Sequence, residues 1–431
     1  MYSLLGGVNL KKLKIKNKFI KGMILSLGIT LSIGTSLAIN QNFKKDNMIE
    51  ASSINIKEEN SQNQILLNSL SNYKDKITSK EDKKMIKEIY DEVSNMNDTE
   101  VNTQYQLLFE HLFDYRNKAL LDKNEKELKQ LYETNKKTGL WAYEHEVQKM
   151  KYLENWSSKQ GVKFNDIKTR VKVKKVKEKE EGLYGVICTV STEYKYSYED
   201  QPDEINMFRI GTYHYLNVKI NDNQCIITKE WYTDPFADSL NLDNIKSDDI
   251  KAYIANQQPK GLELTQEQAK AISYAHQFCG AAADEEHGMK FNSKYKDYNP
   301  DGGDCANFAS QIMFESGKFK KNGTWNYSDN EGTKAWVNAQ AFKNYILNSG
   351  RGSLITKGTY QEVYKAAYNL KPGDFVGYEK GGRITHVSTV TGIDSKGYPL
   401  VTCHNSDRLL VPWDLGWSDK SIKFHIIQVH Y

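Results

Sequence analysis

The sequence predicts an α+β fold built in two parts. Three observations lead to this prediction. Apolar residues recur at helical spacing from about residue 64 to 160, and the period changes to two between Val162 and Tyr232. A new helix then begins at Thr265, followed by Gly-rich strands towards the C-terminus. With 431 residues, the chain is long enough to bury a separate core in each part.

The N-terminus predicts the compartment. Six lysines and no acidic residue precede the apolar run "GMILSLGITLSIGTSLAIN", which ends in the small-x-small pattern Ser36–Ala38. We therefore expect residues 1–39 to be a signal peptide for export. The run approaches the roughly 20 apolar residues of a membrane span, so an uncleaved membrane anchor is the alternative. Residues 40–62 are polar and aperiodic, which is typical of a tether.

Charge and cysteine usage exclude two classes of protein. Without the six N-terminal lysines, the formal net charge of +4 becomes −2, so a nucleic-acid-binding surface is not expected. An odd number of cysteines spread over a long exported chain is not a disulfide framework. Each thiol is therefore either buried or used chemically: Cys188, Cys225, Cys279, Cys305 and Cys403.

Residues 63–236 are predicted to form the first domain. Amphipathic helices come first, and four alternating stretches follow, separated by the turn-like segments "KEKEEG", "EDQPDE" and "NDNQ". Helices followed by an antiparallel meander favour a curved sheet wrapped around a long helix, as in cystatin-like cones. No cluster of side chains suited to catalysis is visible in this part. We therefore expect this domain to serve in binding or as a spacer.

Residues 237–261 are predicted to be a linker, and residues 262–431 to form the second domain. Thr265 is expected to cap the first helix of this domain, with Gln268 completing a capping box.

Cys305 lies between the turn "DGGD" and the apolar run "CANFASQIMFESG". This pattern places the thiol at a helix N-terminus, where the helix dipole and unpaired N–H groups favour a thiolate and can hold an oxyanion. The alternative is a buried, inert cysteine that packs the first turn.

His386 begins the second of three strands predicted in "LKPGDFVGYEKGGRITHVSTVTGIDSKGYPLVTCHNSD". Strand alternation places Ile384, His386, Ser388 and Val390 on one face, so a ring nitrogen of His386 is expected to point towards the helix of Cys305 as a general base. The alternative is a structural histidine.

The third of these strands ends in His404 and Asn405, either of which could orient the His386 ring. We expect His404 to face His386 and Asn405 to point away; Asp407 is the third candidate and otherwise a turn residue. Asn299, six residues before Cys305, is a candidate oxyanion donor, or else an ordinary turn residue.

Trp325 and Trp336 flank a polar loop and are candidate substrate-binding walls, the alternative being a core position. Neither a cofactor nor a metal is predicted, because the histidine in "HEVQK" lacks the second histidine of a zinc-binding helix.

The motifs "GGDCANFASQ", "KAWVNAQAFKNYI", "LKPGDFVGYE", "THVSTVTGID" and "PLVTCHNSDR" occur in this order from about Leu264 to the C-terminus. This region resembles the putative amidase domain family of secreted and spore-associated Gram-positive proteins, which is similar to the papain-like cysteine peptidases of bacterial cell walls. The resemblance implies a papain-like α+β domain, with Cys305 as nucleophile, His386 as base and a polar third member on the next strand. It also matches Asn299 to an amide donor.

Together these observations predict an exported cysteine amidase or peptidase that cleaves an amide bond in peptidoglycan or a cell-wall peptide through a thioester on Cys305. The alternative function is a non-catalytic cell-wall or spore-coat binding protein that keeps the fold. We expect the protein to be extracellular or associated with the cell wall, either released or held to the membrane by its N-terminal apolar segment.

Overall fold

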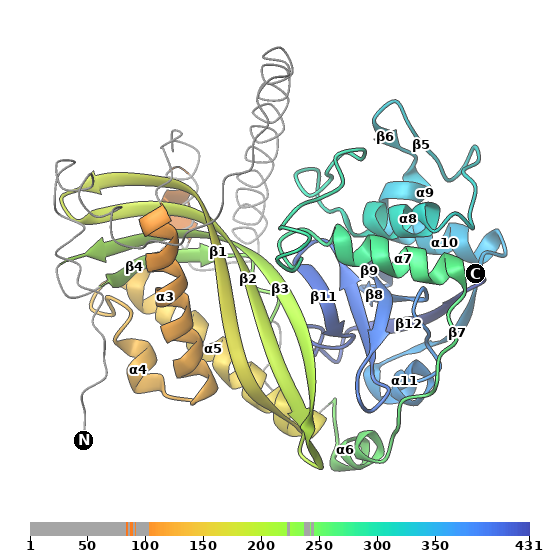
Figure 1. Cartoon of the computed structure of the whole chain (residues 1–431), viewed down its shortest axis with the longest axis horizontal. Coiled ribbons are helices and arrows are strands. Elements are labelled where there is room, and N and C mark those ends of the chain that lie inside the picture. The colour runs from red at the N-terminus through yellow and green to blue at the C-terminus, as the bar shows by residue number, and fades with distance from the viewer. Residues whose placement is uncertain are drawn as a thin grey trace, which may run out of the picture.

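A computed structural model describes residues 83, 84, 87, 88, 91, 103–221, 225–236, 242 and 245–431. The expected signal peptide, the tether and most of the first predicted helices lie outside these residues. The fold is α+β, with a large antiparallel sheet and helices on both of its faces (Figure 1). No helix within the described ranges is long and apolar enough to cross a membrane.

The first part contains helices and four long strands, as the change of period predicts. α3 and α5 pack against one face of the curved strands (Figure 1). Much of two segments expected to be turns is part of the strands. The residues "KEKE" are the last four of β1, and β3 already begins at Gln201, within "EDQPDE". The elements are α3 (Thr103–Leu121), α4 (Glu125–Lys129), α5 (Lys137–Gln160), β1 (Val162–Glu180), β2 (Leu183–Tyr198), β3 (Gln201–Ile220) and β4 (Cys225–Tyr232).

The second part begins after α6 (Asp248–Ala255), which lies inside the expected linker. α7 (Gln266–Gln277) begins with the predicted capping box of Thr265 and Gln268. The remaining helices are α8 (Cys305–Glu315), α9 (Lys334–Val337), α10 (Ala339–Asn348) and α11 (Tyr360–Ala367). The strands are β5 (Tyr327–Ser328), β6 (Glu331–Gly332), β7 (Gly352–Gly358), β8 (Phe375–Lys380), β9 (Arg383–Ile393), β10 (Pro399–Cys403), β11 (Asp407–Pro412) and β12 (Lys423–Val429).

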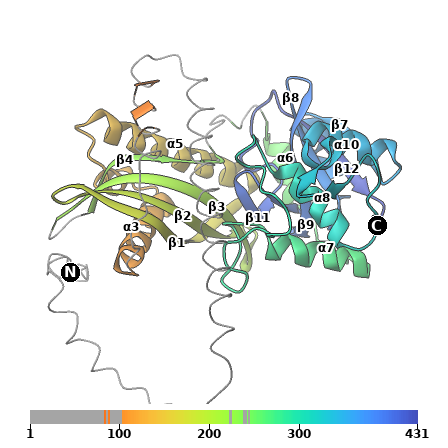
Figure 2. The same cartoon turned by 90° about the horizontal axis from the view of Figure 1, so that it is seen from above.

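One sheet runs through both parts, in the order β1-β2-β3-β11-β10-β9-β8-β12-β7. The edge of β3 that does not pair with β2 has two partner strands. Residues 209–211 pair with β11, and residues 214–220 pair with β4. Figures 1 and 2 both place β11 beside β3 at this junction. The two parts are therefore joined by backbone hydrogen bonds and share a core.

Lys246 fixes the segment between the two parts. Its side chain is fully buried, and its Nζ lies 2.7 Å from Asp414 Oδ2. The ammonium also lies over the rings of Trp156, Tyr360 and Tyr398, at 4.9, 4.9 and 5.6 Å from their centroids. A buried cation needs such a counter-charge and such ring faces. The segment expected to be a linker is thus partly an interior element.

The shared sheet separates two hydrophobic cores of the second part. On one face, α7, α8 and α10 pack against Ile384 and Val387 of β9. On the other face, α11 packs with Tyr378 and Val390, and this core continues into the first part through residues such as Trp156 and Phe208. The face on which a β9 side chain lies therefore decides whether it meets α8.

Candidate functional site

Cys305 is the first residue of α8, as predicted, and 6% of its surface is exposed. The backbone N–H groups of Ala306 and Val387 lie near its sulfur and favour its ionised form. At Val387 the pairing of β9 with β10 has already ended, at Thr389 and Thr402. Burial raises the pKa of Cys305 to about 12, and the two amides oppose that rise. The resting sulfur is therefore a thiol in a corner lined by N–H groups.

His386 does not lie where alternation predicted. It pairs with Tyr378 and shares the sheet face of Tyr378 and Ser388, whereas Ile384 and Val387 face α8. The cause is a register shift between Tyr378 and Glu379, which inserts one residue of β9 between Ile384 and His386. Within the described chain the ring makes no hydrogen bond to Cys305, so the expected Cys305–His386 contact is absent from this state.

The ring of His386 instead contacts groups on its own face. Its Nε2 lies 3.2 Å from Ser388 Oγ and 3.3 Å from Cys403 Sγ. Trp417 stacks on it with ring centroids 5.1 Å apart. Burial lowers the pKa of His386 to about 3, and the charge of Arg408 lowers it further. The resting imidazole is thus neutral.

His404 and Asn405 both turn towards Asp304, the residue before Cys305. Nδ1 of His404 lies 2.5 Å from Asp304 Oδ2, and its Nε2 lies 2.8 Å from the Phe278 carbonyl oxygen. Burial alone would lower the pKa of His404, but the hydrogen bond and charge of Asp304 raise it. The prediction that His404 faces His386 is therefore wrong in this structure, because the ion pair holds the ring at the N-terminus of α8.

Asn405 does not point away, contrary to expectation. Its Oδ1 accepts the backbone N–H of Asp304. A Cβ added to Gly303, whose φ is +144°, would come within 2.3 Å of Asn405 Nδ2. Glycine at this position of "GGDC" lets the end of β10 approach the start of α8. The side chain of Asp407 binds Tyr213 and the Ala281 amide, so it joins the two parts rather than the base.

Asn299 lies in the turn before α8. Its backbone N–H donates to Asp297 Oδ1 and its carbonyl accepts from Gly302. No hydrogen bond of its side chain to Cys305 occurs within the described residues, so the oxyanion role stays a prediction.

The two tryptophans belong to the core. Trp325 and Trp336 are fully buried and pack against each other, with centroids 4.6 Å apart. Their indole N–H groups donate to Ser310 and Asn307 of α8. The expected substrate-facing wall is thus not formed by these residues.

The sequence analysis gave Asp304, Ser388 and Cys403 no specific role in the site. Alternation had placed Ser388 on the strand face of His386, and Cys403 was among the thiols expected to be buried or used, but only the fold showed that both contact the His386 ring. Asp304 directly precedes Cys305, and its contact with His404 likewise needed the fold.

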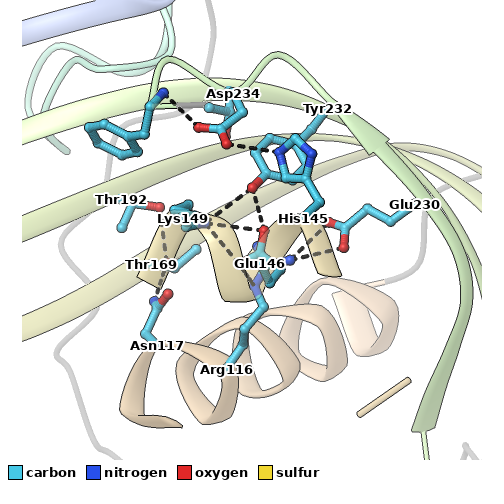
Figure 3. A network of polar contacts seen from close by, with 12 residues as sticks. Arg116, Asn117, His145, Glu146, Lys149, Thr169, Thr192, Glu230, Tyr232 and Asp234 are labelled. Carbon is cyan, nitrogen blue, oxygen red and sulfur yellow. Dashed lines mark hydrogen bonds and ion pairs between the residues drawn. The ribbon is translucent and has the colours of Figure 1, made fainter. Parts of the chain in front are cut away.

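A second buried polar cluster lies in the first part (Figure 3). Arg116 of α3 bonds Glu230 of β4 at 2.9 Å, and Lys149 of α5 lies 3.0 Å from Glu146. These charges balance, and the cavity beside them measures about 10 Å³, the room of one water molecule. The cluster therefore fastens the helices to the sheet and leaves no space for a larger ligand.

Comparison with known proteins bears on the second part. Residues 265–427 match the family described as "Putative amidase domain". The chain is also 31% identical over 156 residues to "Uncharacterized protein YjcM" of Bacillus subtilis (strain 168), an alignment covering 34% of each chain. The chain thus spans about a third of the length of that relative. No solved structure matches. The amidase match includes both Cys305 and His386, and it suggests that the domain hydrolyses an amide bond.

Proposed function

We propose that the protein is an exported cysteine amidase or peptidase that hydrolyses an amide bond in peptidoglycan. One observation carries the proposal: in a region that matches an amidase domain, Cys305 begins α8, and two backbone N–H groups near its sulfur favour the thiolate. Such a corner stabilises a thiolate and the anion that forms when a thiol attacks a carbonyl. We also propose that the second part is similar to papain-like enzymes and that the first part is similar to cystatin-like cones.

The reaction starts from a neutral thiol and a neutral imidazole. As Cys305 Sγ attacks the amide carbon, its proton passes to His386, and the carbonyl oxygen becomes an oxyanion held by N–H groups near the helix terminus. The C–N bond then breaks, and the imidazolium returns the proton to the leaving amine. Water, deprotonated by His386, hydrolyses the thioester and regenerates the thiol.

The position of His386 determines how this proton moves. The ring lies on the face of Tyr378 and Ser388, whereas Cys305 begins α8, which packs against the other face. The proposed transfer therefore needs either a shift of the His386 ring or a water that bridges the ring and the sulfur.

The test uses the full chain, because β3 completes the sheet of the amidase domain. Purified muropeptides are digested and the products identified by mass; Cys305→Ala should abolish turnover and leave the melting temperature within a few degrees. Cys188→Ala is the matched control, since this cysteine is also buried but lies in the first part. A thiol-reactive amide mimic should label Cys305.

Three outcomes oppose the proposal. Full turnover by Cys305→Ala would remove the nucleophile. Binding of peptidoglycan without products or labelling would indicate the non-catalytic wall-binding alternative. Native protein retained in the cytoplasm with an intact N-terminus would contradict export.

A further inference from the structure

Two acceptor atoms, Ser388 Oγ and Cys403 Sγ, lie within hydrogen-bond distance of Nε2 of His386. Tyr378 donates its hydroxyl to the Trp413 carbonyl oxygen at 2.8 Å. A carbonyl only accepts, so the direction of this bond is fixed. The Tyr378 oxygen is then left to accept. The Ser388 hydroxyl lies near both Tyr378 and Cys403, and it opposes the rise in the pKa of each, as a donor to the ionised form does. Ser388 is fully buried, which makes these protein partners its hydrogen-bonding environment.

With its proton directed at Tyr378 or Cys403, Ser388 keeps lone pairs that can accept a hydrogen bond. The His386 Nε2, 3.2 Å from Ser388 Oγ, is the donor that faces them. Cys403 Sγ, 3.3 Å from the same nitrogen, is a second, weaker acceptor. An N–H on Nε2 leaves the lone pair on Nδ1, and Nδ1 makes no hydrogen bond within the described residues.

We propose that Ser388 and Cys403 are positioning residues for the base, which hold His386 as the Nε2–H tautomer with Nδ1 as the proton acceptor. This takes the place that the sequence assigned to His404 or Asn405. It rests on the proposed function only in naming His386 as the base; the tautomer itself is a property of the resting protein. The titratable or charged groups around the ring are Cys403, Tyr378 and Arg408.

The first experiment needs no substrate. ¹⁵N chemical shifts of the imidazole nitrogens are measured in the full chain, and the His386 signals among the nine histidines are identified with a His386→Gln variant. The wild type should show a protonated Nε2 and an unprotonated Nδ1 at neutral pH. Ser388→Ala should bring in the other tautomer. A wild-type ring protonated on Nδ1 would overturn the proposal.

The second experiment measures turnover. Ser388→Ala should lower kcat on the order of 10²-fold with KM nearly unchanged, because a wrong tautomer removes the base without touching substrate. Cys403→Ala should lower kcat less and move the acid limb of the pH profile to lower pH, and Cys403→Ser, which keeps an acceptor, should restore both. The matched controls are Ser191→Ala and Cys188→Ala, which change buried side chains of the first part.

The two proposals fail differently. If Cys305→Ala is inactive while Ser388→Ala and Cys403→Ala keep wild-type kcat and tautomer, only the positioning proposal is refuted. If Cys305→Ala is active, the proposed nucleophile is refuted and the tautomer measurement still stands. Labelling of Cys403 in place of Cys305 would make Cys403 a nucleophile and overturn the positioning role.

Discussion

Replacing His404 separates a structural role from a catalytic one. The imidazole is 1% exposed, pairs with the buried Asp304 carboxylate and stacks on Phe308 with centroids 3.6 Å apart. His404→Ala would leave that carboxylate buried without its counter-charge, which costs about 3–5 kcal/mol. At the 2–4 °C per kcal/mol of large domains, the melting temperature should fall by about 10 °C.

The assay is urea unfolding of the full chain, with turnover measured on the folded protein at low temperature. Asp304→Asn and the double variant complete a double-mutant cycle. We expect the two single variants together to lose more unfolding free energy than the double variant loses, because each single change already removes the same interaction. Turnover of folded His404→Ala should stay within about tenfold of wild type, because the ring does not contact His386. An unfolding free energy within 1 kcal/mol of wild type, with turnover reduced a hundredfold, would refute the reasoning.

Three further predictions concern stability. Burial lowers the pKa of His214 to about 4, so as the pH falls from about 6.5 the unfolded chain takes up a proton at this residue before the folded chain does. The unfolding free energy of wild type relative to His214→Gln should therefore drop by roughly 3 kcal/mol between pH 6.5 and 4. A difference in urea unfolding that stays constant over this range would contradict the prediction. Gly211→Val should loosen the junction of β3 and β11, because a Cβ would come within 2.3 Å of Ala281, and protease cleavage should increase, whereas Gly323→Ala faces open space and should behave as wild type. Lys246→Ala should cost about 3–5 kcal/mol by leaving a buried carboxylate unpaired; thermal unfolding as stable as wild type would show that the residue is dispensable.

Local sequence patterns were sufficient to predict features that depend only on neighbouring residues, such as helix caps, helix starts and strands. The capping box at Thr265 was predicted and confirmed, because the capping groups lie within one helical turn. The start of α8 at Cys305 followed from a Gly-containing turn before an apolar run. The three strands that became β8, β9 and β10 followed from period-two alternation between Gly-rich turns.

Tertiary structure decided how these elements meet. A one-residue register shift in β9 moved His386 to the face opposite α8, and alternation along a single strand cannot reveal a bulge that depends on its partner. The ion pair of Asp304 and His404 joins residues 100 positions apart, and the pairing of β3 with β11 joins parts that composition had separated. The sequence by itself determined which residues open a helix or lie on a strand. Contacts between distant segments determined which of them face one another, because burial and hydrogen-bond satisfaction are properties of the packed chain.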